Sequence, residues 1–166
     1  VQKQRMYNVV KLFTTFNSQT KRVSMHGLSL EVLQRQVLAT GLELDIMYYE
    51  SSISMDSYQE KMRQKMLDFK REGVFYSVYG DILLQDLRDY RENQLSKVGI
   101  TGIFPLWKRN SRELLLEMID AGLKTIIICV NQSYLDKSFL GRVIDRQFLE
   151  DLPSNVDPCG ENGEYH

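Results

Sequence analysis

The 166-residue sequence has only two cysteines, Cys129 and Cys159, and shows no membrane or secretion signal. The two thiols lie far apart in sequence, so they do not form a closely spaced pair of metal ligands. No stretch approaches the roughly 18 apolar residues of a membrane span. With no signal peptide recognisable, we expect a cytoplasmic protein without a membrane partner. Cys129 lies in an apolar run and is expected to be buried, whereas Cys159 is expected in a loop.

The motifs of the commonest nucleotide sites and hydrolases are also absent. The sequence has no Gly-x-x-x-x-Gly-Lys-Ser/Thr loop, no Gly-x-Gly-x-x-Gly and no Gly-x-Ser-x-Gly. Positive and negative charges nearly balance: 21 basic and 22 acidic residues give a formal net charge of −1. The basic residues do not gather with aromatic residues along the sequence, so no nucleic-acid partner is expected.

What the sequence does contain is a regular alternation of strand and helix patterns. Composition is that of a globular protein, with 43% hydrophobic and 26% charged residues, and the length suits one domain over residues 1–166. Apolar and β-branched runs predict strands at 7–16, 44–49, 74–79 and 125–130, with a short extended piece at 103–107. Helical spacing predicts helices at 28–38, 55–72, 85–98, 111–121 and, interrupted at Gly141, 133–152. Residues 17–24 and 153–166 are expected to be loops.

This alternation predicts an α/β fold with a mostly parallel sheet and helices on both faces. The run 125–130 is nearly continuous in apolar residues and is expected to be buried on both faces. In such sheets ligands bind beyond the carboxyl ends of the strands. The polar segments that follow strands, 17–27, 80–92 and 131–136, are therefore the places to look for function.

Gly80 and Asp81 directly follow a predicted strand. Glycine lets the backbone approach a ligand, and a carboxylate there can hold Mg²⁺ or a ribose hydroxyl; the alternative is a plain turn with a helix N-cap. In the next helix, Arg91 can reach a phosphate with its planar guanidinium. Its neighbour Glu92 is four residues after Arg88, so a solvent-exposed ion pair on the helix is the alternative for this charged segment.

Two further segments carry polar groups. His26, after Met25 and before a predicted helix, can contact a base or act as an acid or base, although a capping role is equally consistent. The tail 157–166 combines glycines with carboxylates, an amide and a histidine. Such a loop can point several polar groups at one small molecule, and a solvated surface loop is the alternative.

Taken in order, several stretches resemble the diphthine–ammonia ligase (diphthamide synthase) family of the PP-loop ATP-pyrophosphatase superfamily. The residues in these motifs are similar to those of its bacterial branch. The matching pieces, which span nearly the whole chain, are Thr14-Thr15-Phe16-Asn17, Arg22-Val23-Ser24-Met25-His26-Gly27, Gly80-Asp81-Ile82, Asp86-Leu87-Arg88-Asp89-Tyr90-Arg91-Glu92, Phe104-Pro105-Leu106-Trp107 and the tail from Asp157 to His166.

The resemblance implies a Rossmann-like (adenine nucleotide alpha hydrolase-like) sheet that binds ATP with Mg²⁺ and cleaves it between the α and β phosphates. A carboxylate acceptor, on a small molecule or a protein side chain, would be adenylated and then aminated by ammonia. The residues implied for nucleotide binding are Thr14, Thr15, Met25 and His26 near the adenosine and Gly80, Asp81, Arg91 and Glu92 near the phosphates, with Asp81 as a metal ligand. Those implied for the acceptor are Asp157, Glu161, Asn162, Glu164 and His166.

The sequence departs from the family at its ends. Members carry a Ser-Gly-Gly-Lys-Asp-Ser-like phosphate loop after their first strand, and they continue past the position of His166. The chain is therefore expected to be truncated at both ends. The resemblance assigns no catalytic residue and leaves the acceptor open. Alternatives are a non-catalytic nucleotide-binding or sensory module and, third, a thiolation enzyme, while an apolar stripe on the 55–72 helix is a candidate homodimer contact.

Overall fold

The computed structural model describes residues 6–24 and 27–166. Contacts divide the chain into two compact units, one of residues 1–77 with 92–102 and one of residues 78–91 with 103–166. Each unit is described by itself below. One domain over residues 1–166 stays a prediction, because grouping by contacts does not decide whether the two units fold independently.

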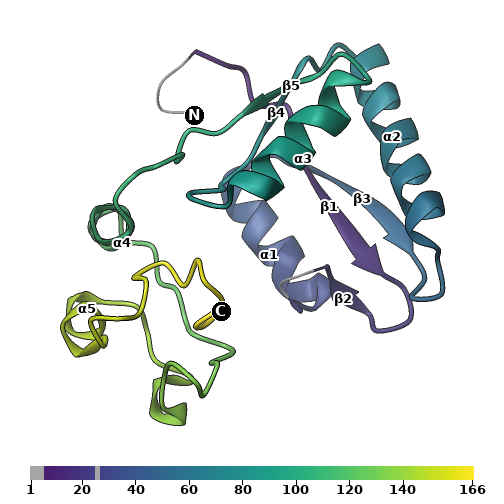
Figure 1. Cartoon of the computed structure of the whole chain (residues 1–166). Helices are drawn as coiled ribbons and strands as arrows, with labels where there is room; N and C mark the ends of the chain where they lie inside the picture. Colours follow the sequence, from purple (N-terminus) through teal and green to yellow (C-terminus); the bar gives the residue numbers. More distant parts are fainter. Residues whose placement is uncertain (1–5, 25–26) are drawn as a thin grey trace. The chain divides into compact units, whose positions relative to one another are not determined.

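The first unit is built on a mixed three-stranded sheet in the order β2-β1-β3 (Figure 1). Its strands are β1 (Lys11–Asn17), β2 (Arg22–Val23) and β3 (Glu43–Tyr49). The long strands β1 and β3 run parallel, in register from Lys11 opposite Glu43 to Asn17 opposite Tyr49. The short strand β2 folds back antiparallel to β1, so the segment predicted as a loop contains a hairpin.

Two helices, α1 (Leu30–Thr40) and α2 (Met55–Arg71), flank this sheet in Figure 1. Each begins at a serine whose side chain caps the first turn, Ser29 for α1 and Ser54 for α2. Gly41 ends α1 in the left-handed conformation, with φ of 69°. Both helices and β3 confirm the sequence predictions within two residues, because period, cap and terminator all agree there.

The helix α2 packs one face against the odd-numbered residues of β1. Phe69 meets Phe13 edge to face at 5.3 Å between ring centroids, and the hydroxyl of Tyr58 lies 3.5 Å from that of Thr15. The predicted apolar stripe on α2 is thus largely used within the unit, since Met66 and Phe69 are buried. Homodimer formation through that stripe stays a prediction.

Two short strands, β4 (Tyr76–Val78) and β5 (Thr101–Ile103), form a second, two-stranded parallel sheet, with α3 (Gln85–Ser96) between them in sequence. β4 is shorter than predicted. The extended piece expected at 103–107 is also displaced: the strand ends at Ile103, and residues 104–109 form turns closed by backbone hydrogen bonds such as Trp107 N–H to Phe104 C=O.

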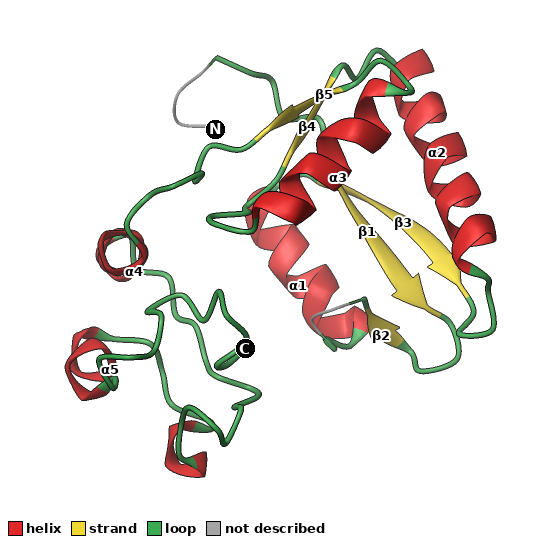
Figure 2. Ribbon diagram, in the orientation of Figure 1, coloured by secondary structure: helices red, strands yellow, loops and turns green. Residues whose placement is uncertain are grey.

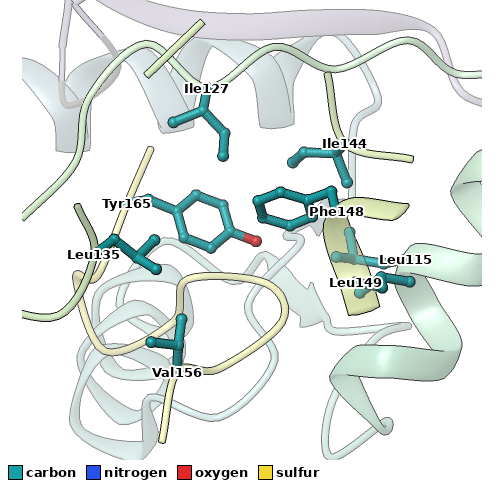
Figure 3. Close-up of a cluster of buried hydrophobic side chains, with 8 residues drawn as sticks. All are labelled: Leu115, Ile127, Leu135, Ile144, Phe148, Leu149, Val156 and Tyr165. Carbon is teal, nitrogen blue, oxygen red and sulfur yellow. The ribbon is translucent and has the colours of Figure 1, made fainter. Parts of the chain in front are cut away.

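In the second unit, α4 (Ser111–Asp120), a 3-10 turn η2 (Lys137–Phe139) and α5 (Arg146–Asp151) surround a hydrophobic core. The ribbon in Figure 2 shows how much of this unit is loop. Figure 3 shows the core, where Phe148 is fully buried and Tyr165 packs against it edge to face at 5.6 Å. The buried members are Leu115, Ile127, Leu135, Ile144, Phe148, Leu149, Val156 and Tyr165.

The predicted strand 125–130 is wrong in the described structure. The segment makes only isolated bridges, Ile126 with Val143 and Val130 with Tyr165, and no continuous ladder. Ile127 is 1% exposed, but Ile126 and Ile128 are 54% and 51% exposed. The hydrophobic core of the unit covers only the side of the segment that carries Ile127. Ile126 and Ile128 therefore remain exposed to solvent.

The prediction of a single interrupted helix at 133–152 is also wrong, although the interruption at Gly141 is confirmed. Gly141, with φ of 81°, does interrupt the segment, but two aspartates cap separate short helices on either side of it. Asp136 accepts from the Ser138 N–H and Asp145 from the Phe148 N–H. The helix α4 is likewise capped by a polar side chain, since Asn110 accepts from the Glu113 N–H.

The described chain is therefore a small α/β protein with a mixed three-stranded and a two-stranded parallel sheet. A Rossmann-like sheet with helices on both faces stays a prediction, because the strands that the structure describes do not join into one sheet. No helix among the described residues is long and apolar enough to cross a membrane.

Candidate functional site

Asp81, in the turn after β4, is paired with Arg91 on α3. Arg91 Nε lies 2.8 Å from Asp81 Oδ2, and Nη2 donates to Oδ1 at 3.4 Å. Nε and Oδ2 are both buried from solvent yet not aligned for a hydrogen bond with each other, so charge more than directional bonding holds the pair. The structure thus joins two residues that the sequence assigns to one site. A ligand that engages either side chain has to replace this pairing.

An aromatic cluster lies under the arginines of α3. The Arg91 guanidinium is 4.3 Å from the centre of the Tyr79 ring, and that of Arg88 is 4.8 Å from Phe104 and 4.7 Å from Trp107. The Tyr79 and Phe104 rings are stacked, with centroids 5.4 Å apart. Such contacts restrain the planar guanidinium groups.

The sequence did not reveal this cluster. Basic and aromatic residues do not gather along the sequence, but the fold brings rings from the residue after β4 and from the turn after β5 to these two arginines of α3. The one available signal was the Phe104–Trp107 motif directly after a strand.

In the tail, Glu164 is a buried carboxylate that organises the loop. It is 1% exposed and accepts hydrogen bonds from the backbone N–H groups of Asp157 and Asn162, each at 2.9 Å, and from the Asn162 amide at 3.0 Å. Burial alone raises the pKa of Glu164, but these hydrogen bonds outweigh it, so the pKa is lowered overall. Glu164 is therefore ionised and enclosed by the loop, which fits a positioning role better than direct contact with an acceptor.

Asp157 is a second organiser of the tail. Its Oδ1 accepts from the backbone N–H groups of Cys159 and Glu161, at 2.9 and 3.3 Å. Gly160 adopts φ of +71°, and a Cβ there would lie 2.8 Å from the Tyr165 carbonyl oxygen, so only glycine fits this bend. The tail is a compact, internally bonded turn and not a loosely solvated loop.

The turn places Glu161 beside the Asp81 segment. Burial raises the pKa of Glu161, as do the charges of Asp157 and Asp81, while hydrogen bonds from the backbone N–H groups of Ile82 and Leu83 oppose the shift. The structure therefore brings together two segments that are about eighty positions apart in sequence, the turn after β4 and the glycine-rich tail. A partly buried carboxyl whose pKa is raised can accept or hold a proton near neutral pH more readily than an ordinary one.

Cysteine chemistry is not part of this arrangement. The Cys159 thiol is half-buried and donates to the Ser111 carbonyl at 3.4 Å, and burial together with Asp157 and Glu161 raises its pKa to about 11. A thiol of that kind is a poor nucleophile. Cys129, expected to be buried, is exposed, because it lies on the segment whose predicted strand does not form.

His166 lies at the end of the tail and pairs through its backbone with Cys129, with N–H to carbonyl distances of 2.8 and 2.9 Å in the two directions. The same tail carries Asn162, whose side chain is bonded to Glu164. The roles of Asn162 and His166 at an acceptor stay predictions.

In the first unit, Thr15 belongs to a group of hydroxyls at the carboxyl end of β1. It is 9% exposed and donates to Ser24 Oγ at 2.6 Å, and Ser24 Oγ lies 3.1 Å from the Tyr49 hydroxyl. Thr14 is half-buried and faces the other side of the sheet, opposite Ile46 in register. Met25 and His26 lie outside the described residues.

Glu92 follows Arg91 on α3 but is grouped with the first unit, whereas Gly80, Asp81 and Arg91 belong to the second. Within the described ranges no group of three or more histidine, cysteine, aspartate or glutamate side chains is arranged to hold a metal ion. Mg²⁺ binding by Asp81 therefore stays a prediction.

These features define an α/β protein whose second unit combines an acid–guanidinium pair, an aromatic cluster and a glycine-rich acidic tail. Comparison with protein families matches residues 110–166 to the "Diphthamide synthase C-terminal domain". This C-terminal region is thus that of the diphthine–ammonia ligase (diphthamide synthase) family. All five residues predicted to contact the acceptor lie within it.

Individual relatives extend the similarity over more of the chain. The diphthine–ammonia ligase of Bos taurus is 36% identical over 106 residues, which is 61% of this chain and 39% of that protein. The Homo sapiens enzyme is 30% identical over 130 residues, covering 75% and 49%. The Danio rerio enzyme is 27% identical over 161 residues, covering 93% and 62%. The chain spans about half the length of the curated relatives it matches.

Proposed function

We propose that the protein carrying this chain is an ATP-dependent, AMP-forming ligase that amidates a carboxylate acceptor with ammonia. The observation that carries the proposal is the juxtaposition of Glu161 with residues 81–83, which joins the family's C-terminal region to the Asp81–Arg91 pair. The relatives' name, diphthine–ammonia ligase, supports both the acceptor chemistry and the nitrogen source.

The reaction has two displacements. A carboxylate oxygen of the acceptor attacks the α-phosphorus of ATP, the bond from that phosphorus to the bridging oxygen breaks, and pyrophosphate leaves. Ammonia then attacks the acyl carbon of the acyl-adenylate, AMP leaves with the oxygen that came from the acceptor, and the nitrogen loses a proton. Orientation of the reactants and stabilisation of the developing negative charge would supply most of the rate.

Arg91 is the residue we assign to charge stabilisation. Its guanidinium is restrained by the Tyr79 ring and by Asp81, so a phosphate oxygen can exchange with the Asp81 carboxylate at little cost in side-chain ordering. Glu161 is assigned to proton acceptance at the nitrogen. Asp81 is the residue we propose to hold Mg²⁺, which would supply positive charge to offset the charge of the phosphates.

Several finer features belong to the same proposal. Thr14 and Thr15, with Met25 and His26, would contact the adenosine, and Glu92 the phosphates. Asp157, Asn162, Glu164 and His166 would build or face the acceptor side. We also propose that the natural protein is a cytoplasmic, bacterial-type member that carries the family's phosphate loop. The genomic sequence around this chain tests this directly: a Ser-Gly-Gly-Lys-Asp-Ser-like stretch is expected.

The product identity tests the reaction class. The natural protein that contains this chain is incubated with ATP, ammonium and candidate carboxylates, and nucleotide products are separated. We expect AMP and pyrophosphate in equal amounts, dependent on an acceptor, and a loss of about a hundredfold or more in kcat/KM for Arg91→Met. ADP and phosphate as products would exclude the proposal, and nucleotide binding without turnover would favour a sensory module.

A further inference from the structure

The apolar segment 125–130 presents two different sides to its surroundings. Ile127 points into the core of the second unit (Figure 3), whereas Ile126 and Ile128 are 54% and 51% exposed. Val143 lies opposite Ile126 in an antiparallel bridge and is 43% exposed. Because directly opposed residues of an antiparallel pair share one face, Ile126 and Val143 form a continuous apolar surface, which Ile128 extends.

One backbone edge of this segment is already paired within the chain. The Ile127 N–H donates to the Arg142 carbonyl at 3.0 Å, and the Ile127 carbonyl accepts from the Gly141 N–H at 2.8 Å. Cys129 exchanges two hydrogen bonds with His166, at 2.9 and 2.8 Å. A further strand cannot add on this side, because these partners already use its donors and acceptors.

The opposite backbone edge is open. The donors and acceptors of alternate residues in a strand point to opposite edges. In the part of the chain that the structure describes, the N–H and C=O groups of Ile126 and Val130 make no backbone–backbone hydrogen bond, and nor does the Ile128 carbonyl. The Ile128 N–H differs, since it donates to the His166 carbonyl at 2.7 Å. An edge with free donors and acceptors is a template for another strand.

The composition of the segment favours a second copy of the same chain as the strand that adds to this edge. Residues 125–130 read Thr-Ile-Ile-Ile-Cys-Val, with high β-propensity and no charge, proline or glycine. This is the composition of segments that pair with copies of themselves. A charged partner strand would find no counter-charge within the segment, whereas an identical segment brings apolar side chains to apolar side chains. The formal net charge of −1 adds little repulsion between two copies.

Lys124 determines the direction of the pairing. It is exposed and directly precedes the segment. A parallel pair would place the two Lys124 ammonium groups side by side, whereas an antiparallel pair separates them to opposite ends of the interface. Since each copy has one open edge, an antiparallel pair related by a two-fold axis uses both edges and closes at two chains.

We propose that two copies of this chain form a dimer by antiparallel pairing of segment 125–130 through its open edge. The pairing gives hydrogen-bond partners to the free backbone groups of Ile126, Ile128 and Val130. It also places the exposed isoleucine side chains of one copy beside those of the other. None of the residues assigned to the ligase reaction belongs to the segment, and dimer formation does not rest on the proposed function.

Analytical ultracentrifugation of the 166-residue chain, from micromolar to submillimolar concentrations, tests the proposal. A reversible monomer–dimer equilibrium is expected. Ile126→Lys and Ile128→Lys should each raise the dimer Kd at least about tenfold, because each puts like charges across the two-fold interface. Leu38→Lys on α1, where the leucine is 79% exposed, is the matched control and should leave the Kd unchanged. A monomer at every concentration, species larger than a dimer, or an equal effect of the control would overturn the proposal.

Cys129 reports whether the dimer uses the proposed interface. It is exposed and lies within the paired segment, so a short bismaleimide should link Cys129 of one copy to Cys129 of the other. Cys159→Ser should keep this cross-link and Cys129→Ser should abolish it, with the dimer retained in both variants. Circular dichroism checks that the lysine variants are folded, as expected for substitutions at exposed positions. A dimer that does not form the Cys129 cross-link would have its interface elsewhere, and the proposal would be wrong.

Discussion

The carboxylate of Glu164 accepts a hydrogen bond from the backbone N–H of Asp157 at 2.9 Å, and the two residues together fold the acidic tail. Asp157 in turn bonds the N–H groups of Cys159 and Glu161. The tail is therefore organised by its own carboxylates, and Glu161 lies near the segment after β4. Because Glu164 and Glu161 lie in different surroundings, the first two predictions treat them separately.

Glu164→Gln should destabilise the chain by at least about 2 kcal/mol, because buried N–H donors lose their charged acceptor. The pKa of Glu164 is lowered in the folded state, so its contribution is present above the ordinary glutamate value and is lost as the pH falls through the folded value. Urea unfolding of the wild type and the variant between pH 7 and pH 3 should show the difference shrinking in acid. A difference that grows in acid would contradict the assignment, and Glu150→Gln is the matched surface control.

Glu161 should titrate above the ordinary glutamate value of about 4.3. Burial and the charges of Asp157 and Asp81 raise its pKa, so ionisation costs folding stability as the pH rises from the ordinary value through the raised one. The carboxyl ¹³C resonance of Glu161, followed against pH, gives the midpoint directly. Asp157→Asn should lower that midpoint, since it removes a charge and keeps the oxygen acceptor. A midpoint at or below the ordinary value would show that Glu161 does not face the acidic segment.

The two cysteines should differ in reactivity. Cys129 is exposed, whereas Cys159 is half-buried with a pKa of about 11. At pH 8 a thiol reagent such as DTNB should therefore modify one thiol quickly and the other slowly. Cys129→Ser should remove the fast phase and Cys159→Ser the slow one. Two equal phases in the wild type would mean that the tail does not cover Cys159.

Thr15 and Ser24 should be energetically coupled through their 2.6 Å hydrogen bond. Thr15→Val and Ser24→Ala are each expected to cost about 1 kcal/mol in the free energy of unfolding. The double variant should cost less than their sum by about 0.5 kcal/mol or more, because the shared bond is lost only once. Additive effects would show that the hydroxyls act separately and do not join the hairpin to β1.

The elements that the sequence predicted well are those in which local signals agree. α1 has its serine cap, its apolar spacing and Gly41, and α2 has Ser54 and a continuous stripe, so neither needed information from elsewhere in the chain. The run 125–130 shows the limit of this approach. Its composition predicts a strand covered on both faces, but whether a second layer covers Ile126 and Ile128 depends on tertiary contacts that a hydrophobic pattern does not specify.

The sequence predicted which residues belong to the candidate site, but it did not predict the contacts between them. Asp81, Arg91 and Glu161 were all selected from the sequence, yet the Asp81–Arg91 pair and the approach of Glu161 depend on the fold. The acceptor role of Glu164 stays a prediction, and the sequence did not reveal that the loop's own N–H groups enclose its carboxylate. Tyr79 was not selected, since an aromatic residue at the end of a strand does not by itself indicate a partner.

The most direct test of the proposed ligase follows an oxygen atom. An acceptor that supports AMP formation by the natural protein is labelled with ¹⁸O in its carboxylate, and the products are analysed by mass spectrometry. If the carboxylate attacks the α-phosphorus, AMP gains one ¹⁸O for each amide formed, and pyrophosphate stays unlabelled. Label in inorganic phosphate, formed together with ADP, or AMP without label would contradict the account.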